Sequence, residues 1–134
     1  MPHVPRLDRI VEVALYVDDI ARSVRFYQTL FGFDVVATDA RLYALGVRGQ
    51  QVLLICQKTA SARLAVGAHA ADGEQHVAFA VPADDLPAWE ARLRDQNVIV
   101  EEVKEWSRGG RSVYFRDPDR HLIELASPGV WSIY

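Results

Sequence analysis

The chain has few of the features that mark several large classes of protein. Its 134 residues include one cysteine, Cys56, so an intrachain disulfide is excluded. No apolar run approaches the roughly 20 residues that a membrane-spanning helix needs. The N-terminal segment MPHVPRLDR contains two prolines and no apolar core, which is not the pattern of a signal peptide. We therefore expect a cytoplasmic protein that does not interact with membranes.

Concentrated positive charge is also missing. The chain has 15 Lys and Arg against 18 Asp and Glu, a formal net charge of −3, and its basic residues form no run. Proteins that bind polyanions carry a basic stripe or patch, so we expect no nucleic-acid partner. Half of the residues are hydrophobic and a quarter are charged, an ordinary globular composition, and the length fits one domain.

The most informative feature that is present is an internal repeat. The segment EVALYV begins at Glu12 and HVAFAV begins at His76, 64 residues later, and each precedes an acidic turn and an amphipathic helical pattern. At an offset of 70, RLYALGV and QQVLLIC (41–56) align with RSVYFRD and RHLIELA (111–126). We interpret this as a tandem duplication. Duplicated units often pack around a pseudo-twofold axis, which brings equivalent positions together.

Residue periodicity predicts that each unit is βαβββ. In the first unit the predicted elements are strands at 10–17, 33–37, 41–47 and 51–57 and a helix at 19–31. In the second they are strands at 75–81, 98–104, 111–116 and 121–126 and a helix from 84–86 to about 96. The predicted fold is one α+β domain with a curved mixed sheet and outer helices. Its parts are module 1 (about 8–57), an irregular linker (58–74), module 2 (about 75–127) and a tail (128–134).

Three ionisable side chains are predicted to share the inner, helix-free face of this sheet: Glu12, His76 and Glu124. A carboxylate in a partly dry cleft must be neutralised by a proton, a cationic side chain or a metal ion. Two glutamates and a neutral histidine match the charge of a divalent ion and leave coordination positions open for a substrate. The alternative is that the glutamates pair with arginines such as Arg41 and Arg111, and that His76 is only hydrogen-bonded.

The remaining histidines are expected to lie outside this site. His121 has the parity of core residues and is interpreted as a turn residue that faces away from the cleft. His3 lies in the N-terminal segment. His69 lies in the linker, where we expect a solvated side chain, with a contribution to a lid over the cleft as the alternative.

Two segments, EVALYVDDIARSVRFYQTLFGF and RSVYFRDPDRHLIELASPG, resemble the vicinal oxygen chelate superfamily, which includes glyoxalases, bleomycin resistance proteins and extradiol dioxygenases. The resemblance covers about residues 8–130. It implies that two βαβββ modules form a cup around a divalent metal, with ligand positions at Glu12, Leu54, His76 and Glu124. Leu54 departs from the glyoxalase I pattern, in which that position is usually Glu. The three ligands that remain resemble the fosfomycin-resistance and extradiol classes, although those commonly have His where this chain has Glu12.

The resemblance also implies roles for other residues. Tyr114 matches a tyrosine that is catalytic in extradiol enzymes, and we expect it to donate a proton or hydrogen bond to the substrate. Glu12 and Tyr114 are the predicted catalytic residues. The pair of carboxylates favours Mn, Mg, Ni or Zn over Fe, without selecting one. Candidates that would shape the substrate pocket are Tyr16, Arg41, Tyr43, Trp106 and Arg111.

These expectations favour a metal-dependent enzyme that binds a small substrate through two adjacent oxygens. Isomerase, lyase, transferase and dioxygenase chemistry all remain open. The alternatives are a metal-free protein that sequesters a drug, as in bleomycin resistance, and a degenerate domain without a ligand. The apolar tail SPGVWSIY (127–134) and the family resemblance together favour a homodimer.

Overall fold

The chain folds into two consecutive βαβββ modules, shown by a computed structural model that describes residues 3–134. Module 1 contains β1 (Glu12–Val17), α1 (Ile20–Phe31), β2 (Asp34–Thr38), β3 (Leu42–Val47) and β4 (Gln51–Gln57). Module 2 contains β5 (His76–Ala80), a 3-10 turn (Ala83–Asp85), α3 (Leu86–Asp95), β6 (Val100–Glu105), β7 (Arg111–Arg116) and β8 (Leu122–Ala126). None of the helices within residues 3–134 has the length and apolar character to cross a membrane.

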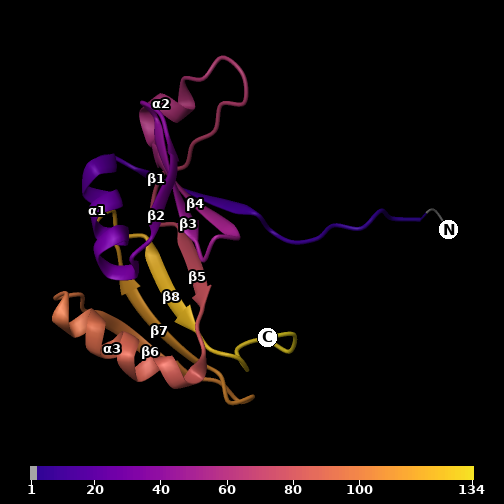
Figure 1. Cartoon of the computed structure of the whole chain (residues 1–134), viewed down its shortest axis with the longest axis vertical. Coiled ribbons are helices and arrows are strands. Elements are labelled where there is room, and N and C mark those ends of the chain that lie inside the picture. Colours follow the sequence, from indigo (N-terminus) through magenta and orange to yellow (C-terminus); the bar gives the residue numbers. More distant parts are fainter. Residues whose placement is uncertain (1–2) are drawn as a thin grey trace.

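The strands form two four-stranded sheets, with orders β1-β4-β3-β2 and β5-β8-β7-β6. In each sheet the first pair is parallel and the other pairs are antiparallel. Figure 1 shows the two sheets following one another along the long axis of the molecule, with α1 and α3 on the same side. The predicted α+β fold of two βαβββ modules is confirmed, and its strands are divided between two sheets.

The pairing registers confirm the internal repeat residue by residue. Ala14 on β1 lies opposite Leu54 on β4, and Ala78 on β5 lies opposite Glu124 on β8. These positions differ by 64 and 70 residues, the two offsets seen in the sequence. Leu54 and Glu124 are therefore structurally equivalent, and one copy has an apolar residue where the other has a carboxylate.

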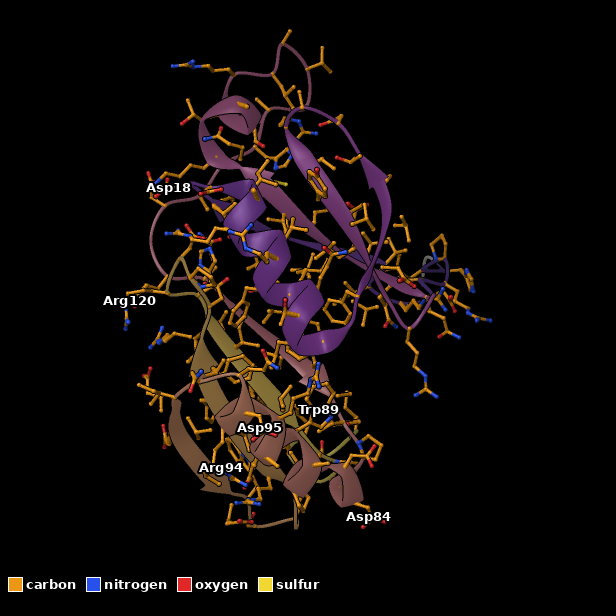
Figure 2. All side chains as sticks on the ribbon, turned by 60° about the vertical axis from the view of Figure 1, so that its left-hand side comes forward. Asp18, Asp84, Trp89, Arg94, Asp95 and Arg120 are labelled. Carbon is orange, nitrogen blue, oxygen red and sulfur yellow. The ribbon has the colours of Figure 1, made fainter. Side chains whose placement is uncertain are left out.

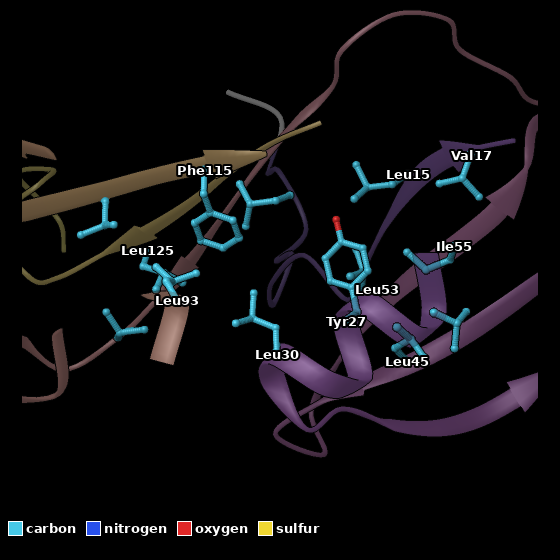
Figure 3. Close-up of a cluster of buried hydrophobic side chains, with 14 of the residues drawn as sticks. Leu15, Val17, Tyr27, Leu30, Leu45, Leu53, Ile55, Leu93, Phe115 and Leu125 are labelled. Atoms are coloured by element: carbon cyan, nitrogen blue, oxygen red, sulfur yellow. The ribbon is translucent and has the colours of Figure 1, made fainter. Parts of the chain in front are cut away.

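Helix α1 joins the two modules through a shared core. Figure 3 shows Tyr27 and Leu30 of α1 between buried residues of module 1 and the module 2 residues Leu93 and Phe115. At the end of α1, the ring of Phe31 lies 5.1 Å from that of Phe79 and 5.5 Å from that of Trp89. Burying each such side chain contributes about 1.5–3 kcal/mol. The modules therefore share one hydrophobic core.

The ends of α1 are fixed by specific hydrogen bonds. The Asp19 carboxylate accepts from the backbone N–H of Arg22 at 3.1 Å, which caps the first turn. Gly32 ends the helix with φ at 72°, a left-handed conformation that glycine adopts without strain. From α3, Arg92 donates to the carbonyl oxygens of Leu30 and Thr29 at 2.6 and 2.7 Å. Module 2 therefore supplies donors for two of the last carbonyl groups of α1.

The turn between β7 and β8 also binds the other module. Asp117 is buried and accepts a hydrogen bond from the Tyr27 hydroxyl at 2.6 Å. Asp119 accepts from the Ser23 hydroxyl at 2.8 Å and from the backbone N–H of Asp18 at 3.1 Å. Figure 2 shows Asp18 and Arg120 on the same side of the molecule, where the turn approaches the start of α1. The DPDR sequence (117–120) is therefore a junction between the modules.

Two expectations about this region need correction. The linker was predicted to contain little regular structure, but it begins with α2 (Lys58–Ala62), which the Gln57 side chain caps by accepting from the Ala60 N–H at 2.6 Å. His121 is more than a turn residue, because it is buried and joins the modules. Its Nδ1 accepts from the Gln75 N–H at 3.0 Å and its Nε2 donates to the Tyr16 carbonyl oxygen at 2.8 Å.

Candidate functional site

The structure brings two of the three predicted metal ligands together. His76 is the first residue of β5, and Glu124 lies in the middle of the neighbouring strand β8. The Nε2 atom of His76 lies 3.2 Å from the Oε1 atom of Glu124. The His76 side chain is 48% exposed and the Glu124 side chain is 9% exposed. The pair thus consists of a nearly buried carboxylate and an imidazole that a ligand can reach.

The hydrogen bond of His76 Nδ1 determines whether the other ring nitrogen, Nε2, carries a proton or a lone pair. Its Nδ1 lies 2.8 Å from the Leu122 carbonyl oxygen, which can only accept, so Nδ1 is assigned the proton. In a neutral imidazole the Nε2 atom then carries a lone pair directed at a carboxylate oxygen. Two acceptors at this distance repel unless a proton or a cation lies between them. Metal-binding histidines commonly show this anchoring through the other ring nitrogen.

The Glu124 carboxylate is held in place by a short chain of hydrogen bonds. Its Oε2 accepts from the Ser112 hydroxyl at 2.6 Å, and the Ser112 oxygen accepts from the Trp106 indole N–H at 2.9 Å. Trp106, a predicted pocket residue, therefore supports the site. Ser112 was not predicted. The sequence did contain a signal for it: Ser112 is two residues from Tyr114 on the same strand, so alternation places this polar side chain on the same inner face as Tyr114 and Glu124.

Tyr114 lies beside this pair. It is opposite Glu124 in the pairing of β7 with β8, and its ring is 6.5 Å from that of His76. Burial raises the pKa of Tyr114, and the negative charge of Glu124 raises it further. The hydroxyl group therefore keeps its proton at neutral pH. It is placed to donate a hydrogen bond or a proton to a ligand at the pair.

Glu12 does not join His76 and Glu124 within one chain. Among residues 3–134, no group of three or more His, Cys, Asp or Glu side chains is arranged to hold a metal ion. The end of β1 contacts the segment that directly precedes β5, since the Tyr16 N–H donates to the Gln75 side-chain oxygen at 3.0 Å. Glu12 is four residues earlier, about 13 Å along an extended strand. The expected convergence within one chain is therefore not observed.

Two of the predicted pocket residues form a separate cluster on module 1 with His69. The Arg41 Nη1 atom lies 3.1 Å from the Ser61 hydroxyl oxygen and 3.3 Å from His69 Nε2. His69 Nδ1 contacts the Tyr16 hydroxyl. His69 is therefore not the solvated linker residue that we expected. Burial raises the pKa of Tyr16, so its hydroxyl is also protonated at neutral pH.

The other two pocket candidates lie away from the inner face. Tyr43 packs against the hydrophobic core, on the opposite side of β3 from Ala44. Arg111 lies 2.8 Å from a Glu90 oxygen of α3 and 3.0 Å from a Glu105 oxygen. Within residues 3–134, neither Glu12 nor Glu124 forms a salt bridge with an arginine. The alternative in which arginines neutralise the two glutamates is therefore not observed.

Comparison with known proteins yields one family. The model of the Glyoxalase/Bleomycin resistance protein/Dioxygenase superfamily matches residues 9–125. The metallothiol transferase FosB of Bacillus licheniformis is 28% identical over 116 residues, which is 86% of this chain and 72% of that protein. The uncharacterized protein YraH of Bacillus subtilis is 27% identical over 125 residues, 87% of this chain and 96% of that protein. A crystal structure of lactoylglutathione lyase from Agrobacterium tumefaciens has a TM-score of 0.89 and 28% identity, and the match covers 96% of this chain and 99% of that one.

Proposed function

Because the chain belongs to the Glyoxalase/Bleomycin resistance protein/Dioxygenase superfamily, we propose that it is a divalent-metal-dependent enzyme. Its substrate would be a small molecule that binds the metal ion through two adjacent oxygen atoms. The observation that carries the proposal is the contact of His76 Nε2 with Glu124 Oε1 at 3.2 Å, in which two metal-binding atoms face each other. The opposite ring nitrogen of His76 is already bound to a carbonyl oxygen, which leaves Nε2 for an ion.

The third ligand in this proposal is Glu12 of a second copy of the chain. Glu12 is exposed and lies between apolar residues that are also exposed, with Ile10 at 82%, Val11 at 54% and Val13 at 37%. Exposed apolar residues at a strand edge favour burial against another chain. A twofold axis would place the Glu12 of each chain beside the His76 and Glu124 of the other, giving a homodimer with two equivalent centres. Each centre would carry a charge of −2, which matches a divalent ion.

The residues of the chain would have distinct roles around the ion, which would polarise the substrate oxygens and stabilise negative charge that develops on them. Leu122 and Ser112 hold His76 and Glu124 in their orientations. Tyr114 would donate a hydrogen bond or a proton to a substrate oxygen from its hydroxyl. Glu12 would provide a carboxylate that binds the ion or moves a substrate proton.

The relatives favour some reaction classes over others. One is named a metallothiol transferase and one structure is that of a lactoylglutathione lyase. These names support transfer or lyase chemistry over dioxygenase chemistry for this chain. The ion itself is expected among Mn, Ni, Zn, Mg and Fe, because the proposed ligands are two carboxylates and an imidazole.

The metal proposal is tested by elemental analysis of protein purified without chelators and by thermal unfolding with each ion. We expect one ion per chain and a higher Tm with the ion that fits. Glu124→Gln and His76→Ala should each weaken metal binding at least about tenfold. Asp95→Asn, at an exposed carboxylate on the outer helix α3, is the control and should bind as the wild type does. A wild-type protein with neither bound metal nor a metal-dependent Tm contradicts the proposal and favours the metal-free alternative.

The proposal that each metal centre lies between two chains is tested by mixing two variants that each lack one ligand. Glu12→Gln chains and His76→Ala chains should each bind little metal when alone. A mixed dimer would have one centre made only of wild-type residues, so mixing should restore binding to about half of the mixed dimers' centres. If each centre lay within one chain, mixing would restore none.

A further inference from the structure

We propose that Tyr16, Arg41 and His69 form an anion subsite on the inner face of module 1, which binds a carboxylate, phosphate or phosphonate group. As a consequence that rests on the proposed function, the substrate or cosubstrate would be elongated, with its metal-binding end near Glu12 and an anionic group at this subsite.

Arg41 offers an unused pair of donors to such a group. Its Nη1 atom binds the Ser61 oxygen and His69 Nε2, at 3.1 and 3.3 Å. Among residues 3–134, no carboxylate lies within salt-bridge distance of its guanidinium group, and its Nε and Nη2 atoms have no hydrogen-bond partner. These two N–H groups point the same way along one edge of the guanidinium plane. That edge is the one that binds carboxylate and phosphoryl oxygens through two parallel hydrogen bonds.

Asp39, in the turn before β3, is bound to the backbone rather than to this edge. Its Oδ1 atom accepts from the backbone N–H groups of Arg41 at 2.7 Å and Leu42 at 3.0 Å. These hydrogen bonds, with a smaller contribution from the Arg41 charge, lower the pKa of Asp39, so its carboxylate is ionised at neutral pH. Asp39 forms no salt bridge with the guanidinium group among residues 3–134, so the Nε and Nη2 edge of Arg41 stays available to an anion.

His69 directs the hydroxyl proton of Tyr16 toward the same region. Because Arg41 can only donate, His69 Nε2 must accept, and the proton of the neutral ring lies on Nδ1. Nδ1 then donates to the Tyr16 oxygen, which it contacts. The hydroxyl proton of Tyr16 is consequently free to donate to another acceptor. A half-buried cation and a free hydroxyl proton are the donors that an oxyanion requires.

The position of the cluster relates it to the proposed metal centre. Tyr16 and Glu12 lie on the same face of β1, because the residues between them alternate and Leu15 and Val17 point into the core. Four residues of extended strand separate them by about 13 Å. This separation exceeds the reach of a ligand with only a few heavy atoms. The subsite would therefore select the far end of a longer molecule.

The test is a titration of the 134-residue chain, freed of metal by passage over a chelating resin, with inorganic phosphate and with methylphosphonate. Binding is followed by calorimetry and by NMR of the arginine Nε–H and histidine ring resonances. We expect saturable binding that shifts the Arg41 and His69 signals. Arg41→Gln should weaken it at least about tenfold, and Tyr16→Phe should weaken it severalfold. Arg63→Gln removes an exposed arginine from the same linker and should leave binding unchanged.

Two outcomes would overturn the subsite. One is phosphate binding that is equal in the wild type and in Arg41→Gln, and the other is an equal loss in Arg63→Gln, which would indicate a general charge effect. Because the protein is free of metal, the result does not depend on the proposed metal centre. Glu124→Gln should lose metal binding and keep phosphate binding, so failure of one proposal is distinguishable from failure of the other.

Discussion

The hydroxyl of Tyr27 on α1 donates to the buried carboxylate of Asp117, 90 residues later, at 2.6 Å. This contact connects the helix of module 1 to the turn that closes module 2. Asp117 also accepts from the backbone N–H groups of Asp119 and His121, both at 2.9 Å. The geometry of the turn thus depends on a side chain that is itself held by the other module.

Removing the hydroxyl of Tyr27 should destabilise the fold. Tyr27→Phe leaves a buried carboxylate oxygen without its donor, which costs about 1–3 kcal/mol. Urea denaturation measures the change in the free energy of unfolding. Tyr43→Phe is the control, since no hydrogen bond of the Tyr43 hydroxyl occurs among the described residues, and it should change stability by less than about 0.5 kcal/mol. Equal effects of the two substitutions would show that the Tyr27–Asp117 contact does not stabilise the fold.

The same carboxylate should make stability depend on pH. Burial raises the pKa of Asp117 in the folded protein, although its hydrogen bonds with Tyr27 and the backbone oppose the rise. The folded protein then keeps a proton over a pH range in which the unfolded chain has released it. This group therefore lowers the free energy of unfolding as the pH rises from the ordinary aspartate pKa through the raised one.

The Asp117→Asn side chain cannot ionise. The difference in stability between this variant and the wild type should therefore shift in favour of the variant as the pH rises above the ordinary aspartate pKa. Denaturation curves at a series of pH values measure it. Asp95→Asn replaces an exposed aspartate of α3 and should show no such trend. A difference that stays constant with pH would contradict the raised pKa.

The hydrogen bond from Ser112 should tune the affinity of the proposed metal centre. Ser112→Ala removes the donor that orients the Glu124 carboxylate, and loss of such a supporting contact typically costs about 10–100-fold in metal affinity. Competition with a chelating dye would measure this change. Ser107→Ala, in the exposed loop after Trp106, should leave the affinity unchanged. Unaltered affinity in Ser112→Ala would show that Glu124 needs no such orientation.

Arg92 should stabilise the contact between the two helices. Arg92→Met removes the hydrogen bonds to the Leu30 and Thr29 carbonyl oxygens at the end of α1. Hydrogen bonds from a charged donor typically contribute about 1.5–3 kcal/mol to the free energy of unfolding. Thermal unfolding should show a lower Tm. Arg94→Met is the control on the same helix, because its side chain has no hydrogen bond among the described residues. A Tm loss of equal size in the control would point to charge rather than to these bonds.

Gly110 and Gly129 should tolerate no side chain, because their backbones are in contact. A Cβ atom at Gly110 would lie 2.2 Å from the Val130 nitrogen. Gly110→Ala should therefore displace the C-terminal tail and destabilise the fold by at least about 1–3 kcal/mol. Thermal unfolding and proteolysis near Val130 measure this. Gly67→Ala has a positive φ of 68° but open space around it, so it should cost only the smaller conformational penalty.

Much of the fold could be predicted from the chain itself because the information is local. Alternation with period two in EVALYV and HVAFAV marks the first strand of each module, and the repeat offsets give the equivalence of Leu54 with Glu124 before any coordinates are known. The His76–Glu124 pair and the nearby Tyr114 also follow from this alternation, since neighbouring strands of one module bring them together.

The placement of Glu12, His69 and Arg111 could not be predicted this way. The alternation of apolar and polar residues predicts which face of a strand a side chain occupies, but it does not predict which strand ends lie next to each other. That depends on contacts between distant segments, such as the Gln75 side chain at the Tyr16 N–H and the Glu90 carboxylate at Arg111. Local periodicity thus specifies two βαβββ modules and the side chains on their inner faces. The separation of Glu12 from His76 and Glu124 arises from long-range packing, because β1 meets the second module at Tyr16 rather than at its first residue.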